Sequence, residues 1–359
     1  MLCFRHSGPV LLLLTLLGTS AHAQEPAPPE QADPHPYTLH VYANRMQVAA
    51  LVLNENAENI AGVTADKFNI SIDSGPRFHP TRTRVEGDDP VSLAILLDDD
   101  GSDRDLMKAV TAELPVFART ALLPDDRISV YAVDCNLIGS ANRAHATPEV
   151  MEKSIASALA YPTLHQPNGR HCGSKVKLWD TVTTVLARMS TSPERRVLLV
   201  VSSGGDAGSS ISPEHLALRA GSLGVAVFSI ASNTQTVFDP HVRSLLATGL
   251  RALPASAGMS YITSSNGGMI FSIDPSQVRS TLEHFARLLR TRYIVEFPTP
   301  DEGGAGDHNL SIEVPRAFEV LATGDSWNDL DQSVRDDPST VHGSASPTVM
   351  GKKRPAAPR

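Results

Sequence analysis

Apolar and polar positions follow two different patterns along the chain, and the change falls near residue 87. Before it, short alternating runs separated by Asn, Glu and Gly turns are typical of β-strands. They predict strands at 39–42, 46–53, 68–72 and 77–85. These strands define a small β module over residues 37–86. A unit of about 50 residues can hardly be stable alone.

Between residues 87 and 291, nearly continuous apolar runs alternate with amphipathic segments. The apolar runs are typical of strands buried on both faces, and they cover 91–97, 128–133, 196–201 and 225–230. Alternating strands and helices over about 200 residues predict an α/β fold, with a doubly wound, mainly parallel sheet and right-handed crossovers. This Rossmann-like arrangement is the fold class that we expect.

The helices of this zone are marked by apolar stripes and by capping residues. The clearest stripe consists of Leu106, Val110, Leu114, Phe117 and Ala121. Pro115 within it is expected to kink or divide that helix. A capping residue followed by proline predicts four later helix starts, at Thr147-Pro148, Ser212-Pro213, Asp239-Pro240 and Asp274-Pro275.

The C-terminal part changes character twice. Over residues 292–325, we expect strands 293–297 and 309–314 to form a β-hairpin around the Gly-rich loop 301–307, with a short strand at 318–321. This hairpin should pack on the β module or on the sheet. Residues 326–359 are rich in Ser, Pro and Asp and end in basic residues, which is typical of a disordered tail.

The N-terminal segment 1–23 has the features of a cleaved secretory signal. Its apolar run, 10–17, is too short to span a bilayer, and Ala-His-Ala at 21–23 fits signal-peptidase cleavage. We therefore expect a soluble, secreted or periplasmic chain that starts at Gln24, followed by a Pro-rich linker over 24–36. An uncleaved membrane anchor is the alternative.

Two cysteines, Cys135 and Cys172, remain after the signal is removed, because Cys3 leaves with it. An even number of cysteines in an exported chain favours one disulfide between them. Two unrelated buried thiols are the alternative.

Composition and motifs narrow the possible functions. The chain has 31 Lys plus Arg against 39 Asp plus Glu, a net charge of −8, and no basic block, so nucleic acid and anionic membranes are disfavoured as partners. It has no G-x-S-x-G, H-E-x-x-H, G-x-G-x-x-G or Walker A motif. We therefore expect a protein that is not an enzyme. A hydrolase whose Ser, His and Asp come from distant positions is a distant third reading.

The most informative loop follows the first predicted strand of the α/β zone. Asp98, Asp100 and Ser102 lie in an acidic stretch, LLDDDGSDRD, where the carboxyl end of a strand meets a helix. Ligands of doubly wound sheets bind at these ends, and carboxylate and hydroxyl oxygens suit Mg²⁺ or Ca²⁺. The alternative is a solvated acidic turn in which Asp103 caps the next helix.

Four stretches together resemble von Willebrand factor type A (VWFA) domains, and more specifically the secreted bacterial VWFA-related proteins described from acidobacteria. The acidic loop is similar to the family's first metal-site motif, DxSxS. The others are GVTADKFNISIDSG (62–75), RRVLLVVSSGGDAGSS (195–210) and YIVEFPTP with the later NLSIEV. The resemblance spans residues 37–325. It implies a VWFA fold and a divalent-metal site at the rim of the sheet.

The implied metal site departs from the family pattern in all three of its loops. In the first loop, Asp100 stands where the family has serine. In the second, the threonine position falls at or near Val176, and Ser174 is the closest hydroxyl. In the third, the aspartate position falls on Ser203, and Asp206 matches a later acidic residue. The resemblance thus implies Mg²⁺ or Ca²⁺ held by Asp98, Asp100 and Ser102, with Ser174 or Asp206 assisting.

Two functional hypotheses follow from these observations. The first is an exported binding or adhesion module whose rim engages a carboxylate of a protein or glycan partner through the ion's open coordination position. The second is a metal-free structural or assembly protein of the cell envelope.

Overall fold

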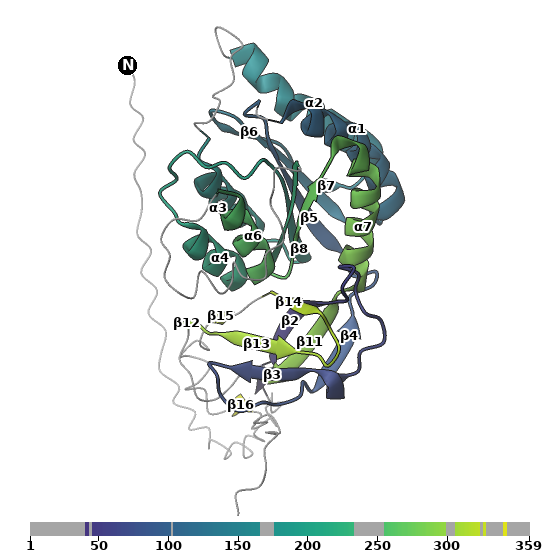
Figure 1. Ribbon diagram of the computed structural model, residues 1–359, viewed down its shortest axis with the longest axis vertical. Coiled ribbons are helices and arrows are strands. Elements are labelled where there is room, and N and C mark those ends of the chain that lie inside the picture. The colour runs from purple at the N-terminus through teal and green to yellow at the C-terminus, as the bar shows by residue number, and fades with distance from the viewer. Residues whose placement is uncertain are drawn as a thin grey trace, which may run out of the picture.

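A six-stranded sheet with helices on both faces forms the larger part of the protein (Figure 1). The computed structural model describes residues 40–42, 45–101, 103–165, 176–232, 255–298, 306–323, 326–327 and 340–342. The strands of this sheet are β5 (Val91–Asp98), β6 (Arg127–Val133), β7 (Leu137–His145), β8 (Arg195–Val201), β9 (Val225–Ser232) and β10 (Ile270–Ile273).

The order of the strands in this sheet is β10-β9-β8-β5-β6-β7. All neighbours are parallel except β6 and β7, which are antiparallel. Counted along the chain from β5, this is the order 3-2-1-4-5-6 of doubly wound folds. The predicted α/β fold class is confirmed.

Helices cover both faces of the sheet and bury two separate cores. One face carries α1 (Arg104–Ala121), α2 (Pro148–His165) and α7 (Val278–Thr291), and the other carries α3 (Leu178–Met189), α4 (Pro213–Ser222) and α6 (Ala255–Ser265). Leu93, Ile95 and Leu97 of β5 face the first set, whereas Ala94 and Leu96 face the second. Both faces of β5 are therefore buried, which explains its continuous apolar sequence.

Helix starts were predicted well, and the effect of one proline was not. Pro148 and Pro213 begin α2 and α4, and the 3-10 turn η2 (Pro275–Gln277) leads into α7. Asp239-Pro240 lies outside the described residues. Of the two effects expected of Pro115, division of the helix is wrong, because α1 runs from Arg104 to Ala121 without interruption, and the kink stays a prediction. Burial of the apolar stripe on both sides of the proline outweighs the lost hydrogen bond.

The apolar pattern of the sequence does not predict two strands of the main sheet. The edge strand β7 mixes polar and apolar residues, has no fully buried side chain and pairs only with β6, so it lacks the apolar run that marks the other strands. Strand β10 has four residues and lies at the opposite edge.

The β module is built from both ends of the chain. Its main sheet has the order β14-β2-β11-β4 and consists of β2 (Arg45–Leu53), β4 (Arg82–Val85), β11 (Tyr293–Pro298) and β14 (Glu319–Ala322). A second pair joins β3 (Asn69–Ile72) to β13 (Leu310–Glu313), next to the short turn η1 (Ala65–Lys67). Phe68, Phe78, Tyr293 and Phe297 are part of the core of this module.

The predicted C-terminal hairpin is wrong. Strand β11 pairs with β2 on one side and with β4 on the other, while β13 pairs with β3. Both edges of β11 are therefore occupied, and it has no free edge for β13. The C-terminal strands complete the N-terminal sheet and do not pack on it as a separate hairpin.

This pairing makes the α/β domain an insertion within the β module. Strands β4 and β11 are antiparallel neighbours, with Val85 opposite Tyr293. The next residues also meet, because the Glu86 amide donates to the Arg292 carbonyl at 2.8 Å. The chain thus enters the α/β domain and returns from it at adjacent positions.

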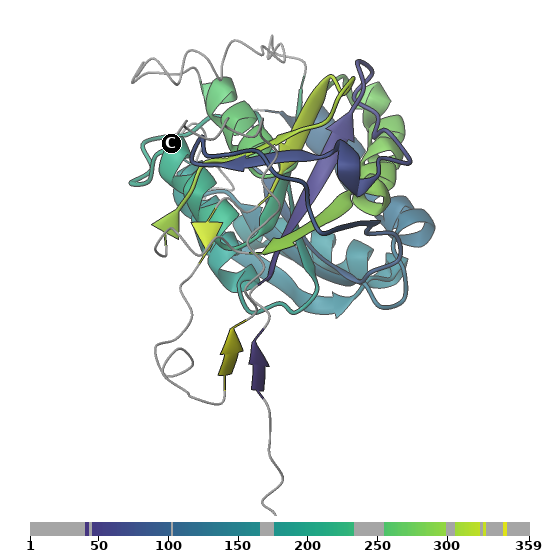
Figure 2. The same cartoon turned by 90° about the horizontal axis from the view of Figure 1, so that it is seen from below.

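Four short strands lie near the chain ends. Strand β1 (His40–Tyr42) is parallel to β16 (Thr340–His342), and Figure 2 shows this pair side by side. Strand β12 (Gly306–Asp307) pairs with β15 (Ser326–Trp327). Strands β15 and β16 belong to the segment predicted to be a disordered tail. The rest of that tail, the predicted signal segment and the linker lie outside the described residues. Within the described ranges, no helix combines the length and apolar character needed to cross a membrane.

Candidate functional site

The carboxyl ends of β5 and β8 form the rim where the sequence placed its candidate site. Asp98 is the last residue of β5, and Ser202 directly follows β8. The two strands are parallel neighbours, with Leu97 opposite Val201. From β5 the sheet continues to β6 on one side, and from β8 it continues to β9 on the other. The rim between β5 and β8 is therefore the topological switch point, where doubly wound proteins bind ligands.

Asp98 is a buried acid with one partnered and one unpartnered oxygen. Its residue is 7% exposed, and the Ser202 hydroxyl donates to its Oδ2 at 2.6 Å. Ser202 in turn accepts a hydrogen bond from the Gly204 amide at 3.0 Å. Asp98 Oδ1 has no hydrogen-bond partner among the described residues. Burial raises the pKa of Asp98 to about 7, and the charges of Asp100 and Asp99 act in the same direction.

The rest of the acidic loop turns sharply into α1. The Asp99 amide donates to the Val133 carbonyl at 2.8 Å, and Gly101 has a φ of 80°, which glycine adopts without strain. Asp103 is the N-cap of α1 and accepts from the Leu106 amide at 3.4 Å. The capping role proposed as an alternative for Asp103 is confirmed. Ser102 lies outside the described residues.

Asp206 has a different role from the predicted one. Its Oδ1 accepts from the Trp179 amide (3.2 Å) and the Ser209 hydroxyl (2.5 Å). Its Oδ2 accepts from the amides of Gly208 and Ser209, at 3.0 and 2.9 Å. Both oxygens are used to cap α3 and to hold their own loop. The structure thus gives Asp206 a capping role in place of the predicted assisting ligand.

Val176 forms an apolar wall beside the rim. It is 3% exposed and belongs to the core beneath α3 and α4, and its carbonyl accepts from the Ala207 amide at 2.8 Å. No metal ligand can come from its side chain. Ser174, the nearby hydroxyl, lies outside the described residues. Cys135 is disulfide-bonded, whereas Cys172 lies outside them, so that pairing stays a prediction.

Sequence reasoning missed two polar residues at this rim. It placed Ser203 at the third-loop position, but Ser202 is the residue that binds Asp98. Asp134 follows β6 at the same edge, beside Asp98 through the pairing of Asp98 with Val133, and it is 4% exposed. Ser202 and Asp134 could both have been found from the sequence, because each is a polar residue directly after a buried strand. Across the described residues, no group of three or more His, Cys, Asp or Glu side chains could hold a metal ion.

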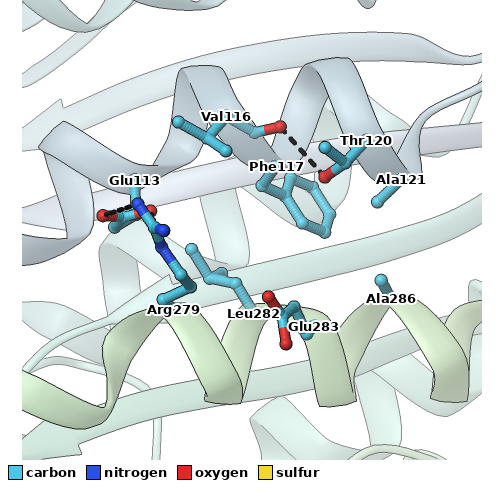
Figure 3. A pocket seen from close by; sticks show the side chains of 9 residues that line it. All are labelled: Glu113, Val116, Phe117, Thr120, Ala121, Arg279, Leu282, Glu283 and Ala286. Carbon is cyan, nitrogen blue, oxygen red and sulfur yellow. Dashed lines mark hydrogen bonds and ion pairs between the residues drawn. The ribbon is translucent and has the colours of Figure 1, made fainter.

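A second concave feature lies between α1 and α7 (Figure 3). This cavity of about 440 Å³ has Phe117 and Leu282 among its lining residues. Three of its polar side chains already have partners: Arg279 holds Glu113 through two bonds of 3.1 Å, and the Thr120 hydroxyl donates to the backbone at 3.0 Å. The rim, with its unpartnered Asp98 oxygen, is therefore the stronger candidate site.

Comparison with known proteins gives structural matches only. No protein-family profile matches the sequence, and the search of curated proteins gives no match. Proximal thread matrix protein 1 from the mussel byssus is similar at 14% identity and a TM-score of 0.41, over 57% of this chain and 49% of that chain. The match thus spans about half of the mussel protein.

Two bacterial structures are similar at the same level. They are BatB from Bacteroides thetaiotaomicron (12% identity, TM-score 0.39, 56% of this chain and 100% of that chain) and the vWF domain of the pilus tip protein Mfa5 from Porphyromonas gingivalis (9%, 0.38, 56% and 95%). Values this low assign no family. The α/β class of this protein rests on its own strand order and helix layers.

Proposed function

We propose that this chain is an exported binding module of the von Willebrand factor A type, whose rim binds a carboxylate of a protein or glycan partner. One observation carries the proposal: Asp98 and Ser202 meet at the topological switch point, and Asp98 keeps a buried oxygen without a partner among the described residues. The four sequence stretches that resemble the family support it.

A divalent cation is the second element of the proposal. The charges of Asp99 and Asp100 already act on Asp98, so a cation would relieve their mutual repulsion. Mg²⁺ is commonly held by one or two carboxylates and keeps several waters. Asp98 and Asp100 would supply the carboxylates, and Ser102 would add a hydroxyl oxygen. When bound, the ion offers an open position to the partner's acidic group. The chain's own part is to orient Asp98 through the Ser202 hydroxyl.

A metal-free structural or assembly role is the second candidate. It is favoured by Val176, which puts an apolar side chain at the second loop, and by Asp206, whose oxygens are used in capping. In this reading Asp98 and Ser202 form a neutral hydrogen-bonded pair that closes the end of the sheet.

Thermal unfolding with added Mg²⁺ or Ca²⁺, at constant ionic strength, separates the two candidates. A cation that binds only the folded chain raises Tm with concentration. We expect this rise in the unmodified chain and in the control variant Asp105→Asn, which removes an exposed charge from the first turn of α1, directly after the acidic loop. We expect none in Asp98→Asn. No rise in the unmodified chain, or equal rises in all three proteins, would refute the cation site.

The remaining parts of the proposal concern processing, localisation, the disulfide and enzymatic activity. We propose that the mature chain begins at Gln24 and is secreted or periplasmic, that Cys135 pairs with Cys172, and that the protein is not an enzyme. Mass spectrometry of the exported protein, with and without reduction, tests the first two. An intact 1–23 segment on the exported protein, or free thiols at both cysteines, would contradict them.

A further inference from the structure

Three arginines and two acids are gathered where the α/β domain joins the β module. Arg195 begins β8, Arg290 and Arg292 lie at the end of α7, Glu86 follows β4, and Asp126 precedes β6. The side chains of Glu86 and Asp126 are 1% and 0% exposed, and that of Arg292 is 2% exposed. The cluster therefore lies in the interior, at the two points where the chain crosses between the domains.

Both acids of this junction cluster are fully used. Glu86 accepts from Arg292 Nε at 2.7 Å and Nη2 at 3.1 Å, and it also forms an ion pair with Arg195. Asp126 pairs with Arg290 and accepts from the amide of Val91 at 2.8 Å.

The charges of the junction cluster do not balance. Three guanidinium groups face two carboxylates, which leaves one excess positive charge in a buried place. The neighbouring Arg84–Asp89 pair, at 2.5 Å, is neutral in itself. Burial lowers the pKa of Arg195, and the charges of Arg292 and Arg290 lower it further, against the opposing effect of Glu86. Burial is the largest of these effects, so the case for an excess positive charge rests on the count of three guanidinium groups against two carboxylates.

One NH2 group of the junction cluster, Nη1 of Arg292, lies on the side of its guanidinium away from Glu86. Arg292 uses Nε and Nη2 for Glu86, so the planar guanidinium directs Nη1 to its other end. Arg292 Nη1 is buried and has no hydrogen-bond partner among the described residues. A buried polar group of this kind normally has a partner, whether from the protein, an ordered water or an ion.

We propose that the junction cluster binds a small inorganic anion, with chloride as its ligand, at Arg292 Nη1. A water molecule would accept a hydrogen bond from Nη1 but leave the excess positive charge uncompensated. A monovalent anion would accept the hydrogen bond and also compensate the charge. Among the described residues, Arg292 Nη1 is the buried nitrogen of the cluster that has no partner, and one nitrogen with two N–H donors suits a single-atom ion better than a polyatomic oxyanion. Arg195 and Arg290, at 12% and 18% side-chain exposure, are the members of the cluster nearest to solvent.

The test is thermal unfolding of the full chain at constant ionic strength, with gluconate replaced stepwise by chloride. A ligand of the folded state should raise Tm in a saturating manner, by about 2–5 °C for a chain of this size. Arg292→Met removes both the excess charge and the unpartnered N–H, so it should abolish the chloride dependence. Arg84→Met, which removes a half-exposed arginine from the same junction, should retain it.

A second measurement tests the chloride site if Arg292→Met does not fold. Crystals of the unmodified protein soaked in bromide should show an anomalous peak within about 3.5 Å of Arg292 Nη1, because bromide replaces chloride at hydrogen-bonding distance. A water at that position with no peak would overturn the proposal. So would a Tm of the unmodified protein that is the same in gluconate and chloride.

Discussion

Replacing Asp98 by asparagine tests how a buried acid at the rim affects stability. Burial raises the pKa of Asp98 from 3.8 to about 7, so the folded chain holds this proton more tightly than the unfolded chain does. Between these two values the unfolded chain has lost the proton and the folded chain keeps it. Stability must therefore fall as the pH rises from about 4 to 7. Below this window the contribution of Asp98 is at its most favourable, and above it that contribution is lost.

The size of this effect follows from the shift. A raised pKa costs about 1.4 kcal/mol for each unit, and a shift from 3.8 to about 7 therefore removes about 4 kcal/mol of stability above pH 7. This is a large part of the roughly 5–15 kcal/mol that stabilises a typical domain. Asparagine has nearly the same shape and no charge, and it can still accept from the Ser202 hydroxyl. Asp98→Asn should thus gain stability over the unmodified chain as the pH rises, by about 3 kcal/mol between pH 5 and pH 8, and the two proteins should be equal only below about pH 4.

Urea denaturation measured from pH 5 to pH 8 gives the required free energies of unfolding. The curves of the unmodified chain and of Asp98→Asn should diverge as the pH rises. Asp105→Asn, which removes an exposed carboxylate, should run parallel to the unmodified chain. Parallel curves for Asp98→Asn and the unmodified chain would refute the burial argument. Mg²⁺ should restore stability at pH 8 and have little effect at pH 5 if a cation binds the ionised Asp98.

Four further substitutions, one of them a control, test other parts of the structure. Glu86→Ala leaves buried arginines uncompensated and should cost about 3–5 kcal/mol in urea denaturation, whereas Arg84→Ala, from a half-exposed ion pair, should cost less than about 1 kcal/mol. Gly268→Ala should abolish folding as judged by circular dichroism, because its Cβ would lie 1.9 Å from the Val227 carbonyl oxygen; a normal melting curve would contradict this. Val176→Thr restores a hydroxyl at the apolar wall and should increase the Tm response to Mg²⁺; an unchanged response would separate this wall from the cation site.

The α/β domain could be predicted from the sequence because its strands and helix starts are marked by residues that are close together in the chain. Strand β5 is buried on both faces, and so it appears as an unbroken apolar run. Pro148 and Pro213 mark their helices by a rule that involves adjacent residues only. The pairing of β11 has no local signal, since its partners β2 and β4 lie more than 200 residues earlier in the chain. The sequence therefore identified β11 as a strand and paired it with the wrong neighbour.

The candidate site was predictable in part for the same reason. Asp98 follows directly from its position at the end of a buried strand, because parallel strands present their carboxyl ends at one edge. The role of Asp206 depends on a contact with Trp179, 27 residues away, which no local pattern encodes. An acidic residue in such a loop can cap a helix or bind an ion, and only the fold decides between the two.

The rim and the junction cluster lie at opposite ends of the same strand. Strand β5 starts at Val91, close to Glu86, and ends at Asp98, and its eight residues span about 26 Å. Even without screening by salt, two unit charges at that separation interact by only about 0.6 kcal/mol at an effective dielectric constant of about 20. Any larger influence of the rim on the β module would have to be mechanical. Such an influence would pass along β5, which begins shortly after Glu86, and along β8, which begins at Arg195. The two adjacent chain crossings would then carry it into β4 and β11 (Figure 1).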